Sequence, residues 1–372
     1  MALSVFADAL PFTEMKRNYT EWIDGIQLAE LQPNIAYSSS LHWQLYCDKY
    51  PDDRDTFVDW GRVPEQNKLV CAIATLLSPF DRGGNFSVFV KKVLDRAVFR
   101  RNAFANIPLK FRKDFSEIGQ YLFWNKTVYE REDIFKGFKV VSQDEGHISF
   151  DESIEKLESA INHGDKNIMF VTGFPDALGH KTRRGEVYSK RLAPYMKRFR
   201  SCIELYHERF PDEDILIVSD HGMSTIKKRI DLRLEERFGK QSKNTYIAYS
   251  DSCIMCIWSK DEGLLKRMAD YLNTREEGHL LTGEEREYYR ATKKKFGDLI
   301  YILREGNCFA DSWFGKSLRK PNPEGEGMHG FWPERSARDQ MACIVLISKK
   351  KKLKDFYVYE DAHQLIKEVM QG

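Results

Sequence analysis

The side chains in this sequence with the clearest capacity for chemistry are three aspartates and three histidines, because carboxylate and imidazole groups together bind catalytic divalent metal ions. They are Asp8, Asp176, His180, Asp220, His221 and His329. Most of them follow short apolar runs with the pattern of buried strands, and open α/β sheets gather ligands at the carboxyl ends of their strands. Two sets of three ligands, each with positions open for water or a substrate oxygen, indicate two catalytic ions. Mixed nitrogen and oxygen ligands suit zinc, and manganese also accepts them.

The spacing of these residues supports a shared site. Asp176 and His180 are four residues apart, so one helical turn brings both side chains to the same side, where a single ion can bind both. The adjacent Asp220 and His221 point in different directions from an extended strand, but from a strand end they can reach two neighbouring ions. Each motif alone has an ordinary explanation as a turn, a surface pair or a helix cap. Together, in this order and on these elements, they favour a two-metal centre.

Short apolar runs alternate with longer helical patterns along the chain. This alternation predicts an α/β fold with a mostly parallel central sheet and helices on both faces, as a three-layer sandwich. Buried strands are expected at 3–7, 167–172, 214–219 and 341–348, and helices at 38–50, 153–162, 184–210 and 359–370.

The alternation of apolar runs and helical patterns is interrupted between residues 66 and 145. There, helical stretches at 66–77 and 86–104 lead into an aromatic-rich segment. This change predicts an inserted cap subdomain at 66–145, with residues 1–65 and 146–372 forming the catalytic core. Several basic residues of the cap either meet an anionic substrate or belong to a solvated helix face. They are Lys91, Lys92, Arg96, Arg100 and Arg101.

The composition limits the classes of function. With 58 basic and 56 acidic residues the net charge is only +2, which argues against a bulk binder of nucleic acid or membrane surfaces but leaves local patches open. No apolar run reaches about 18 residues and no secretory signal pattern is visible, so neither a transmembrane helix nor export is expected. Seven irregularly spaced cysteines suit a reducing compartment, so a cytoplasmic protein is expected. Cys253 and Cys256, the closest pair, are expected to be ordinary strand residues.

Taken together, the motifs resemble those of the alkaline phosphatase superfamily. The resemblance is carried by Asp8, Tyr-Ser-Ser at 37–39, Asp-Ala-Leu-Gly-His at 176–180, Ser-Asp-His-Gly-Met at 219–223 and Gly-Met-His-Gly at 327–330. It spans nearly the whole chain and is nearest to the type I phosphodiesterase/nucleotide pyrophosphatase group. It implies an alkaline-phosphatase-like fold and a phosphate-ester substrate. The sulfatase branch is disfavoured, because its Cys-x-Pro-x-Arg core is absent from this sequence.

The resemblance also implies a role for each motif residue. One metal ion would be held by Asp8, Ser38, Asp220 and His221, and the other by Asp176, His180 and His329. Ser38 would be the nucleophile that carries a phosphoserine intermediate, since its distance from Tyr50-Pro51 fits the family better than that of Ser39 or Ser40. A bound metal ion lowers the pKa of such a hydroxyl, and the positive end of the helix that begins there favours a phosphate.

The chain departs from the family pattern where the substrate would bind. Relatives often carry His-Gly shortly after the Tyr-Pro pair, whereas Tyr50-Pro51 is followed here by Asp-Asp-Arg-Asp. Nucleotide pyrophosphatases also place a phosphate-holding Asn downstream, where this chain offers Asp59. The candidate substrate-binding residues are therefore Asp59 and His42, which lies one turn after Ser38. For His42 the alternative is a histidine whose contacts lie within the fold.

The expected activity is the hydrolysis of a small phosphate ester, as by a phosphodiesterase or nucleotide pyrophosphatase. One alternative is a phosphomonoesterase or a mutase-like phosphoryl transferase, in which the phosphoserine passes to an alcohol. Another is a catalytically inactive metal-binding module, against which the complete set of six ligands counts. Neither a nucleic-acid polymer nor a membrane is expected as a partner.

Overall fold

The computed structural model describes residues 1–18, 21–81, 85–95, 104, 107–118, 129, 131–143, 149–182, 185–309 and 327–371, with backbone alone at 85–88. The chain forms two compact units. The core unit comprises Met1–Tyr50, Tyr121–Thr225 and Glu324–Gly372, and the second unit comprises Pro51–Gln120 and Ile226–Pro323. The first part of the segment predicted to be a cap lies in the second unit and its last part in the core unit. Its role as a cap stays a prediction.

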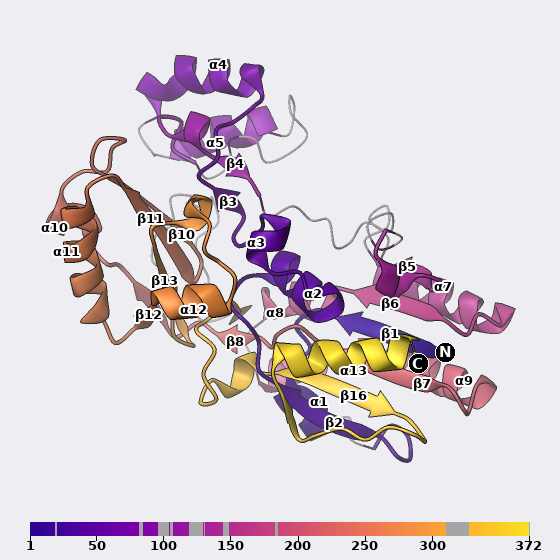
Figure 1. Ribbon diagram of the computed structural model, residues 1–372. Helices are drawn as coiled ribbons and strands as arrows, with labels where there is room; N and C mark the ends of the chain where they lie inside the picture. The colour runs from indigo at the N-terminus through magenta and orange to yellow at the C-terminus, as the bar shows by residue number, and fades with distance from the viewer. Residues whose placement is uncertain are drawn as a thin grey trace. The chain divides into compact units, whose positions relative to one another are not determined.

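A seven-stranded sheet forms the centre of the core unit (Figure 1). Its strands are, in spatial order, β17 (Phe356–Tyr357), β2 (Gln27–Leu31), β16 (Ala342–Ile347), β7 (Asp214–Val218), β1 (Ala2–Ala7), β6 (Ile168–Thr172) and β5 (Lys139–Ser142). Within this sheet β16 runs against its neighbours β7 and β2, and the other pairs are parallel. The mostly parallel sheet predicted from the apolar runs is therefore confirmed.

The strand β1 shows how the sequence positions the site. All six of its residues are buried, as is typical of a parallel strand covered on both faces. Val5 pairs with Phe170 on one side and with Ile217 on the other. This register brings the carboxyl ends of β1, β6 and β7 to one edge of the sheet, where Asp8 donates its backbone N–H to the carbonyl oxygen of Thr172 at 2.9 Å.

Helices cover both faces of this sheet. Leu3 and Val5 pack into one hydrophobic cluster with residues of α7 (Phe150–His163) and α9 (Glu186–Arg209). Phe6 alternates to the other face, where its ring meets His42 and Tyr46 of α2 (Ser38–Cys47) with centroids 4.5 and 6.1 Å apart. The helix α13 (Tyr359–Gln371) packs on α2. The predicted three-layer arrangement is thus present in the core unit.

Element ends follow local chemistry. The helix α7 begins with a capping box between Ser149 and Glu152 and ends at Gly164, which has a φ of 90°. The helix predicted at 38–50 ends earlier, at Cys47, because Asp48 adopts the left-handed conformation with a φ of 51°. A separate short helix, α3 (Pro51–Arg54), then begins with a proline at its first position.

The second unit contains a four-stranded sheet that the sequence patterns did not predict. Its strands are β10 (Tyr246–Asp251), β11 (Ile254–Ser259), β13 (Leu299–Leu303) and β12 (Gly278–Leu280), in spatial order and all antiparallel. Around it the unit holds α4 (Lys68–Leu77), α5 (Asn85–Leu94), α10 (Leu234–Phe238), α11 (Glu262–Asn273) and α12 (Gly283–Tyr288). Cys256 lies in the strand β11, as expected, whereas Cys253 lies in the turn before it, and both side chains are buried. Among the described residues no helix is long and apolar enough to cross a bilayer.

Candidate metal centre and nucleophile

The sheet edge at the carboxyl ends of β1 and β7 brings the predicted motif residues together. Asp8 follows β1 directly, and Asp220 and His221 come just after β7. Asp176 lies in α8 (Phe174–Gly179), which His180 terminates, and His329 follows the short strand β15 (Gly327–Met328). Ser38 is the first residue of α2. All seven belong to the core unit.

Ser38, the predicted nucleophile, lies among side chains that are predicted to bind one metal ion. Its Oγ lies 3.1 Å from Asp8 Oδ1 and 2.9 Å from His221 Nε2. His221 Nε2 is also 3.4 Å from Asp8 Oδ1 and 3.4 Å from Asp220 Oδ2. These four side chains, which the family resemblance assigned to one ion, are therefore within a few ångströms of one another, and all four are buried.

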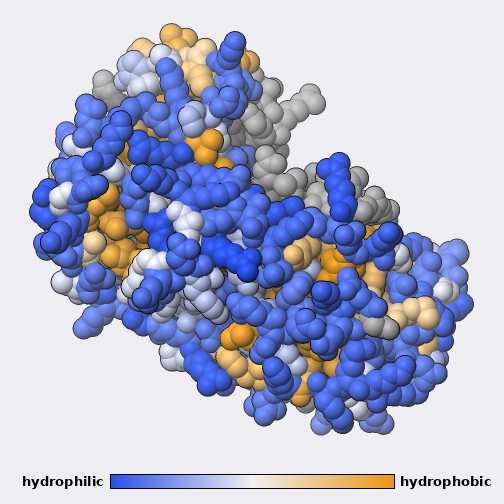
Figure 2. Space-filling view, viewed as in Figure 1, coloured by the Kyte–Doolittle hydropathy of each residue, from blue (hydrophilic) through white to orange (hydrophobic). Residues whose placement is uncertain are grey.

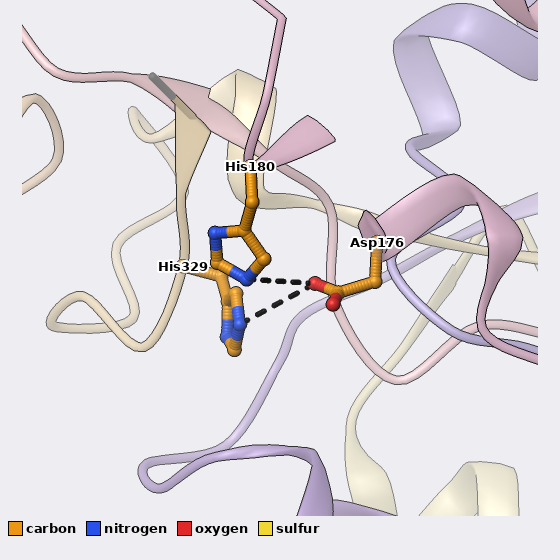
Figure 3. A group of neighbouring side chains, drawn as sticks. All are labelled: Asp176, His180 and His329. Atoms are coloured by element: carbon orange, nitrogen blue, oxygen red, sulfur yellow. Dashed lines mark ion pairs between the residues drawn. The ribbon is translucent and has the colours of Figure 1, made fainter. Parts of the chain in front are cut away.

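The second predicted ligand set also converges, as Figure 3 shows for its three side chains. Asp176 Oδ1 lies 3.2 Å from His180 Nε2 and 3.5 Å from His329 Nε2. The ring of His329 stacks on that of His221 with centroids 3.7 Å apart and an interplanar angle of 10°. This stacking joins the two sets. Asp176 also has a carboxylate oxygen within 4.8 Å of ligand atoms of Asp8 and His221, so it faces both sets, whereas the resemblance placed it in one.

Backbone carbonyl groups fix how two of the histidines present their nitrogens. His221 Nδ1 lies 2.7 Å from the carbonyl oxygen of Gly222, and His180 Nδ1 lies 3.1 Å from that of Gly327. A carbonyl oxygen only accepts hydrogen bonds, so each Nδ1 is assigned the proton that it donates. In the neutral ring each Nε2 then carries a lone pair directed toward the carboxylates, which is the tautomer that binds a metal ion.

The charges at this edge fit a divalent cation. The pKa of Asp8 is raised well above its usual range, first by burial and then by the neighbouring Asp220 and Asp176. Burial acts in the same direction on Asp176, but His180, His329 and His221 outweigh it and lower the pKa of that carboxyl. Burial, followed by repulsion from His221, lowers the pKa of His329 well below its usual value.

The hydrogen bonds of the site also favour a bound cation, because the site has more acceptor atoms than protons. Ser38 has one hydroxyl proton, yet its Oγ has two acceptors within reach, a carboxylate oxygen and an imidazole nitrogen. Among the described residues, the buried atoms Asp220 Oδ2, Asp176 Oδ1 and His329 Nδ1 form no hydrogen bond. Buried lone pairs in excess of protons are costly unless a cation compensates them. The residues therefore fit bound divalent metal, with the nitrogen and oxygen donors expected of zinc or manganese.

The repulsion around Asp8 predicts an unusual stability change. At pH 7 and in excess chelator, we expect Asp8→Asn to be more stable than the natural protein by on the order of 1 kcal/mol, because burial and the neighbouring Asp220 and Asp176 make this carboxyl costly to ionise and asparagine does not ionise. A carboxyl whose pKa is raised in the folded state contributes stability below its unfolded pKa, near ~4, and loses that contribution as the pH rises through the raised pKa. The difference between the two proteins should therefore shrink as the pH falls toward ~4.

Thermal unfolding with chelator at several pH values measures this effect. With zinc added the order should reverse, since the variant lacks one ligand. An Asp8→Asn protein that unfolds at a lower temperature than the natural protein in chelator at pH 7 would contradict the repulsion argument.

Glycines explain the shape of the loop around His329. A Cβ at Gly327 would lie 2.5 Å from the carbonyl oxygen of Gly179 and 2.6 Å from Met223 Cγ. Gly330 has a φ of 81°, and a Cβ there would lie 2.7 Å from the Tyr37 ring, whose edge meets the His329 ring at 5.7 Å. The Gly-Met-His-Gly motif thus holds His329 in a close-packed backbone that larger residues would not allow.

Several supporting contacts have no signature in the sequence. Ser219 Oγ donates to the carbonyl oxygen of His221 at 2.7 Å and accepts from the backbone N–H of Leu10 at 2.8 Å. The hydroxyl of Tyr359, in α13, donates to the carbonyl oxygen of Asp220 at 2.6 Å. These bonds fix the backbone of the Asp-His pair. Sequence reasoning missed them because each has a main-chain atom as one partner, the N–H of Leu10 or the carbonyl oxygen of His221 or Asp220.

The two candidate substrate-binding residues have different surroundings. His42 is fully buried, and its ring contacts those of Phe6, Trp43, Tyr46 and Tyr129, which supports the interpretation of a histidine held within the fold. Asp59 belongs to the second unit, where burial and the charges of Asp251 and Glu117 raise its pKa. A substrate contact for either residue stays a prediction.

The basic residues of the predicted cap also differ from one another in their surroundings. Lys91 is buried and pairs with Asp81 at 2.8 Å, and Lys92 is exposed. Arg96, Arg100 and Arg101 lie outside the described residues.

Comparisons with known proteins identify the fold. No protein-family model matches the chain, and no curated protein is similar to it in sequence. Among solved structures, human ectonucleotide pyrophosphatase/phosphodiesterase 5 matches with a TM-score of 0.61 and 13% sequence identity, over 100% of this chain and 94% of that one.

The murine form of the same protein matches with a TM-score of 0.58 and 15% identity, over 100% of this chain and 95% of that one. An inactive threonine-to-alanine variant of the murine protein, in complex with AMP, matches with a TM-score of 0.59 and 14% identity, over 100% and 94% of the chains. At such identities the likeness concerns the fold. This chain has, along its full length, the alkaline-phosphatase-like fold of the ectonucleotide pyrophosphatase/phosphodiesterases, the branch its motifs resemble.

Proposed function

We propose that this protein is a two-metal phosphoric-ester hydrolase that acts on diesters or pyrophosphates through a phosphoserine at Ser38. The observation that carries the proposal is the position of the Ser38 hydroxyl. It lies 3.1 Å from Asp8 Oδ1 and 2.9 Å from His221 Nε2, in a unit where Asp176, His180 and His329 form a second acid–imidazole group. A buried serine is seldom surrounded by six potential metal ligands without a catalytic reason.

The proposed division of labour follows the geometry. Asp8, Asp220 and His221 would hold one zinc or manganese ion beside Ser38, and Asp176, His180 and His329 would hold the other. Bound ions at such a site neutralise phosphate charge and lower the pKa of a neighbouring hydroxyl. The hydrogen bonds from Nδ1 of His180 and His221 to backbone carbonyl groups keep both rings oriented for this task.

In the proposed reaction, the residues of the site position the phosphate for attack by Ser38, and no further catalytic side chain is needed. Ser38 Oγ attacks phosphorus as the bond to the leaving oxygen breaks, and that oxygen takes up the proton that Ser38 gives up. Water next attacks the phosphoserine, breaks the bond between Oγ and phosphorus, and restores the hydroxyl. Because Ser38 is the first residue of α2, the positive end of that helix favours the phosphate during both steps.

The substrate class is proposed from the ligand of one similar structure. The murine relative was solved with AMP, which supports a small nucleotide-like or sugar-linked phosphate. The cytoplasmic location expected from the cysteines also stays a prediction.

The direct test compares two chromogenic substrates, bis-p-nitrophenyl phosphate and p-nitrophenyl phosphate, with zinc or manganese supplied. We expect the diester to be cleaved with a kcat/KM about tenfold or more above that of the monoester, a difference of ~1.4 kcal/mol in the transition state. If the monoester were cleaved faster than the diester, the protein would instead be a phosphomonoesterase or a phosphoryl transferase. Absence of turnover with both substrates, in protein shown to hold metal, would contradict an esterase and leave a binding module.

A further inference from the structure

Exposed apolar side chains gather on two helices of the second unit. Of the eight large hydrophobic residues that are exposed in the described part of the chain, five lie between residues 69 and 93. They are Leu69 (55% exposed), Leu76 (72%), Phe80 (75%), Phe89 (55%) and Val93 (46%). They belong to α4, to the short 3-10 helix η1 (Ser78–Phe80) and to α5. We call these five residues the apolar patch.

The helix α4 is apolar on its outward face as well as its inward one. Val70 and Ala74 are buried against Phe104 and Leu109, which accounts for the inward face. Leu69 and Leu76 are two turns apart on the outward side, and no charged residue occurs from 69 to 80. An ordinary surface helix carries polar residues there. In Figure 2 hydrophobic residues are visible, among hydrophilic ones, at the place where Figure 1 labels α4.

The helix α5 carries the other two of these exposed side chains. Phe89 and Val93 are one turn apart and both exposed, so they share a face of α5. Leu94 of α5 packs against the same buried cluster as Ile73 and Leu77 of α4, which holds the two helices together. The patch is therefore carried by a packed pair of helices and not by isolated side chains.

Within residues 65–95, the segment that carries the patch, the exposed charges of the described residues have one sign. Between residues 65 and 95 the acidic side chains are turned inward: Asp81 pairs with Lys91 at 2.8 Å, Asp95 accepts from the backbone N–H of Phe104 at 2.6 Å, and Glu65 pairs with Arg112 at 2.5 Å. The exposed charges among the described residues of this range are those of Lys68 and Lys92. Lys68 directly precedes Leu69, and Lys92 lies between Phe89 and Val93.

We propose that the apolar patch binds the surface of a membrane that contains anionic lipids. Apolar side chains on a helix enter the boundary between headgroups and acyl chains, and lysines beside them attract lipid phosphates. A second copy of the chain suits the patch less well, because a twofold interface places the same surface on both sides and would bring the lysines of one copy toward those of the other. The proposal is independent of the reaction proposed above, since its residues lie outside the metal centre.

Sedimentation with lipid vesicles tests the proposal on the full chain. We expect binding to vesicles of phosphatidylcholine and phosphatidylglycerol in equal parts, and weaker binding to phosphatidylcholine alone. The double variant Leu76→Ser/Phe80→Ser should lower the partition coefficient about tenfold or more, because it removes the two most exposed apolar side chains. Lys68→Gln/Lys92→Gln should remove the preference for the anionic vesicles and its dependence on salt.

Val187→Ser is the matched control, because Val187 is 56% exposed but lies on α9, away from the apolar patch in the sequence and in the other unit. It should bind as the natural protein does, and circular dichroism melts should show all variants folded. The proposal would be overturned if the natural protein bound neither kind of vesicle, or if Leu76→Ser/Phe80→Ser bound as strongly as the natural protein. So would a dimer, seen by analytical ultracentrifugation without lipid, that the same double variant dissociates.

Discussion

Replacing Ser38 by alanine should lower kcat for a phosphodiester by at least about 10⁴-fold, which corresponds to about 5 kcal/mol of transition-state stabilisation. The reason is the position of its hydroxyl, which is within hydrogen-bond distance of both Asp8 and His221. Alanine leaves neither a nucleophile nor an oxygen to carry the phosphoryl group. Metal content should stay unchanged, because three carboxylates and three histidines remain. Steady-state rates and elemental analysis measure the two quantities separately.

The neighbouring serines provide the control for this experiment. Ser39→Ala changes the same helix by one residue and should keep activity within about twofold, as expected for a side chain outside the reacting group. Acid-quenched natural protein should carry phosphate on Ser38, which mass spectrometry can locate. If Ser38→Ala kept most of its activity, or if the phosphate were found on Ser39 or Ser40, the nucleophile would be wrongly assigned while the metal centre could still stand.

Replacing Asp176 by alanine should have the second largest effect, a fall in kcat/KM of at least about 10³-fold together with loss of bound metal. Asp176 is the carboxylate that faces both groups of ligands: its Oδ1 lies 3.2 Å from His180 Nε2 and 3.5 Å from His329 Nε2, and it is also grouped with Asp8 and His221. Without it, His180 and His329 lose the negative charge that they share. Metal occupancy after dialysis should therefore drop from two ions to one or fewer.

An exposed acid outside the predicted ligand sets separates this effect from a general loss of charge. Glu186→Ala, on the exposed start of α9, removes a carboxylate that pairs with Lys190 at 2.7 Å in solvent. Exposed pairs of this kind contribute little to stability, so activity and metal content should stay at the natural level. An Asp176→Ala protein that retained two ions after dialysis would show that Asp176 is not a ligand, and would leave the second site with histidines alone.

The sequence by itself determined which side chains meet at the site. Asp8 directly follows residues 2–7, which are apolar except for Ser4, and the pair Asp220 and His221 follows the apolar residues 215–218 after one serine. Such runs are typical of strands buried on both faces. Parallel strands end at one edge of a sheet, so local patterns were sufficient to predict that these residues converge. The same reasoning gave four of the seven strands of the central sheet and the helices α2, α7, α9 and α13, whereas β2, β5 and β17 were not predicted.

Other parts of the fold carried weaker local signals. The antiparallel sheet of the second unit was missed, because β12 has only three residues and pairs with β13 across 18 intervening positions of helix and loop. No periodic pattern in the sequence records such a pairing. The end of α2 at Cys47 was also missed, since it depends on the left-handed backbone of Asp48, which non-glycine residues adopt only when their surroundings favour it.

Only the tertiary structure decided how the site residues divide and orient. The position of Asp176 between both ligand groups, the stacking of His221 on His329 and the enclosure of His42 by aromatic rings depend on contacts between distant segments. The proton positions on His180 and His221 depend on carbonyl oxygens of Gly327 and Gly222. Every residue has such a carbonyl, so the sequence does not mark which ones bond. The sequence gives the type of each side chain directly. Distances and hydrogen-bond partners are defined only when folding brings separate segments of the chain together.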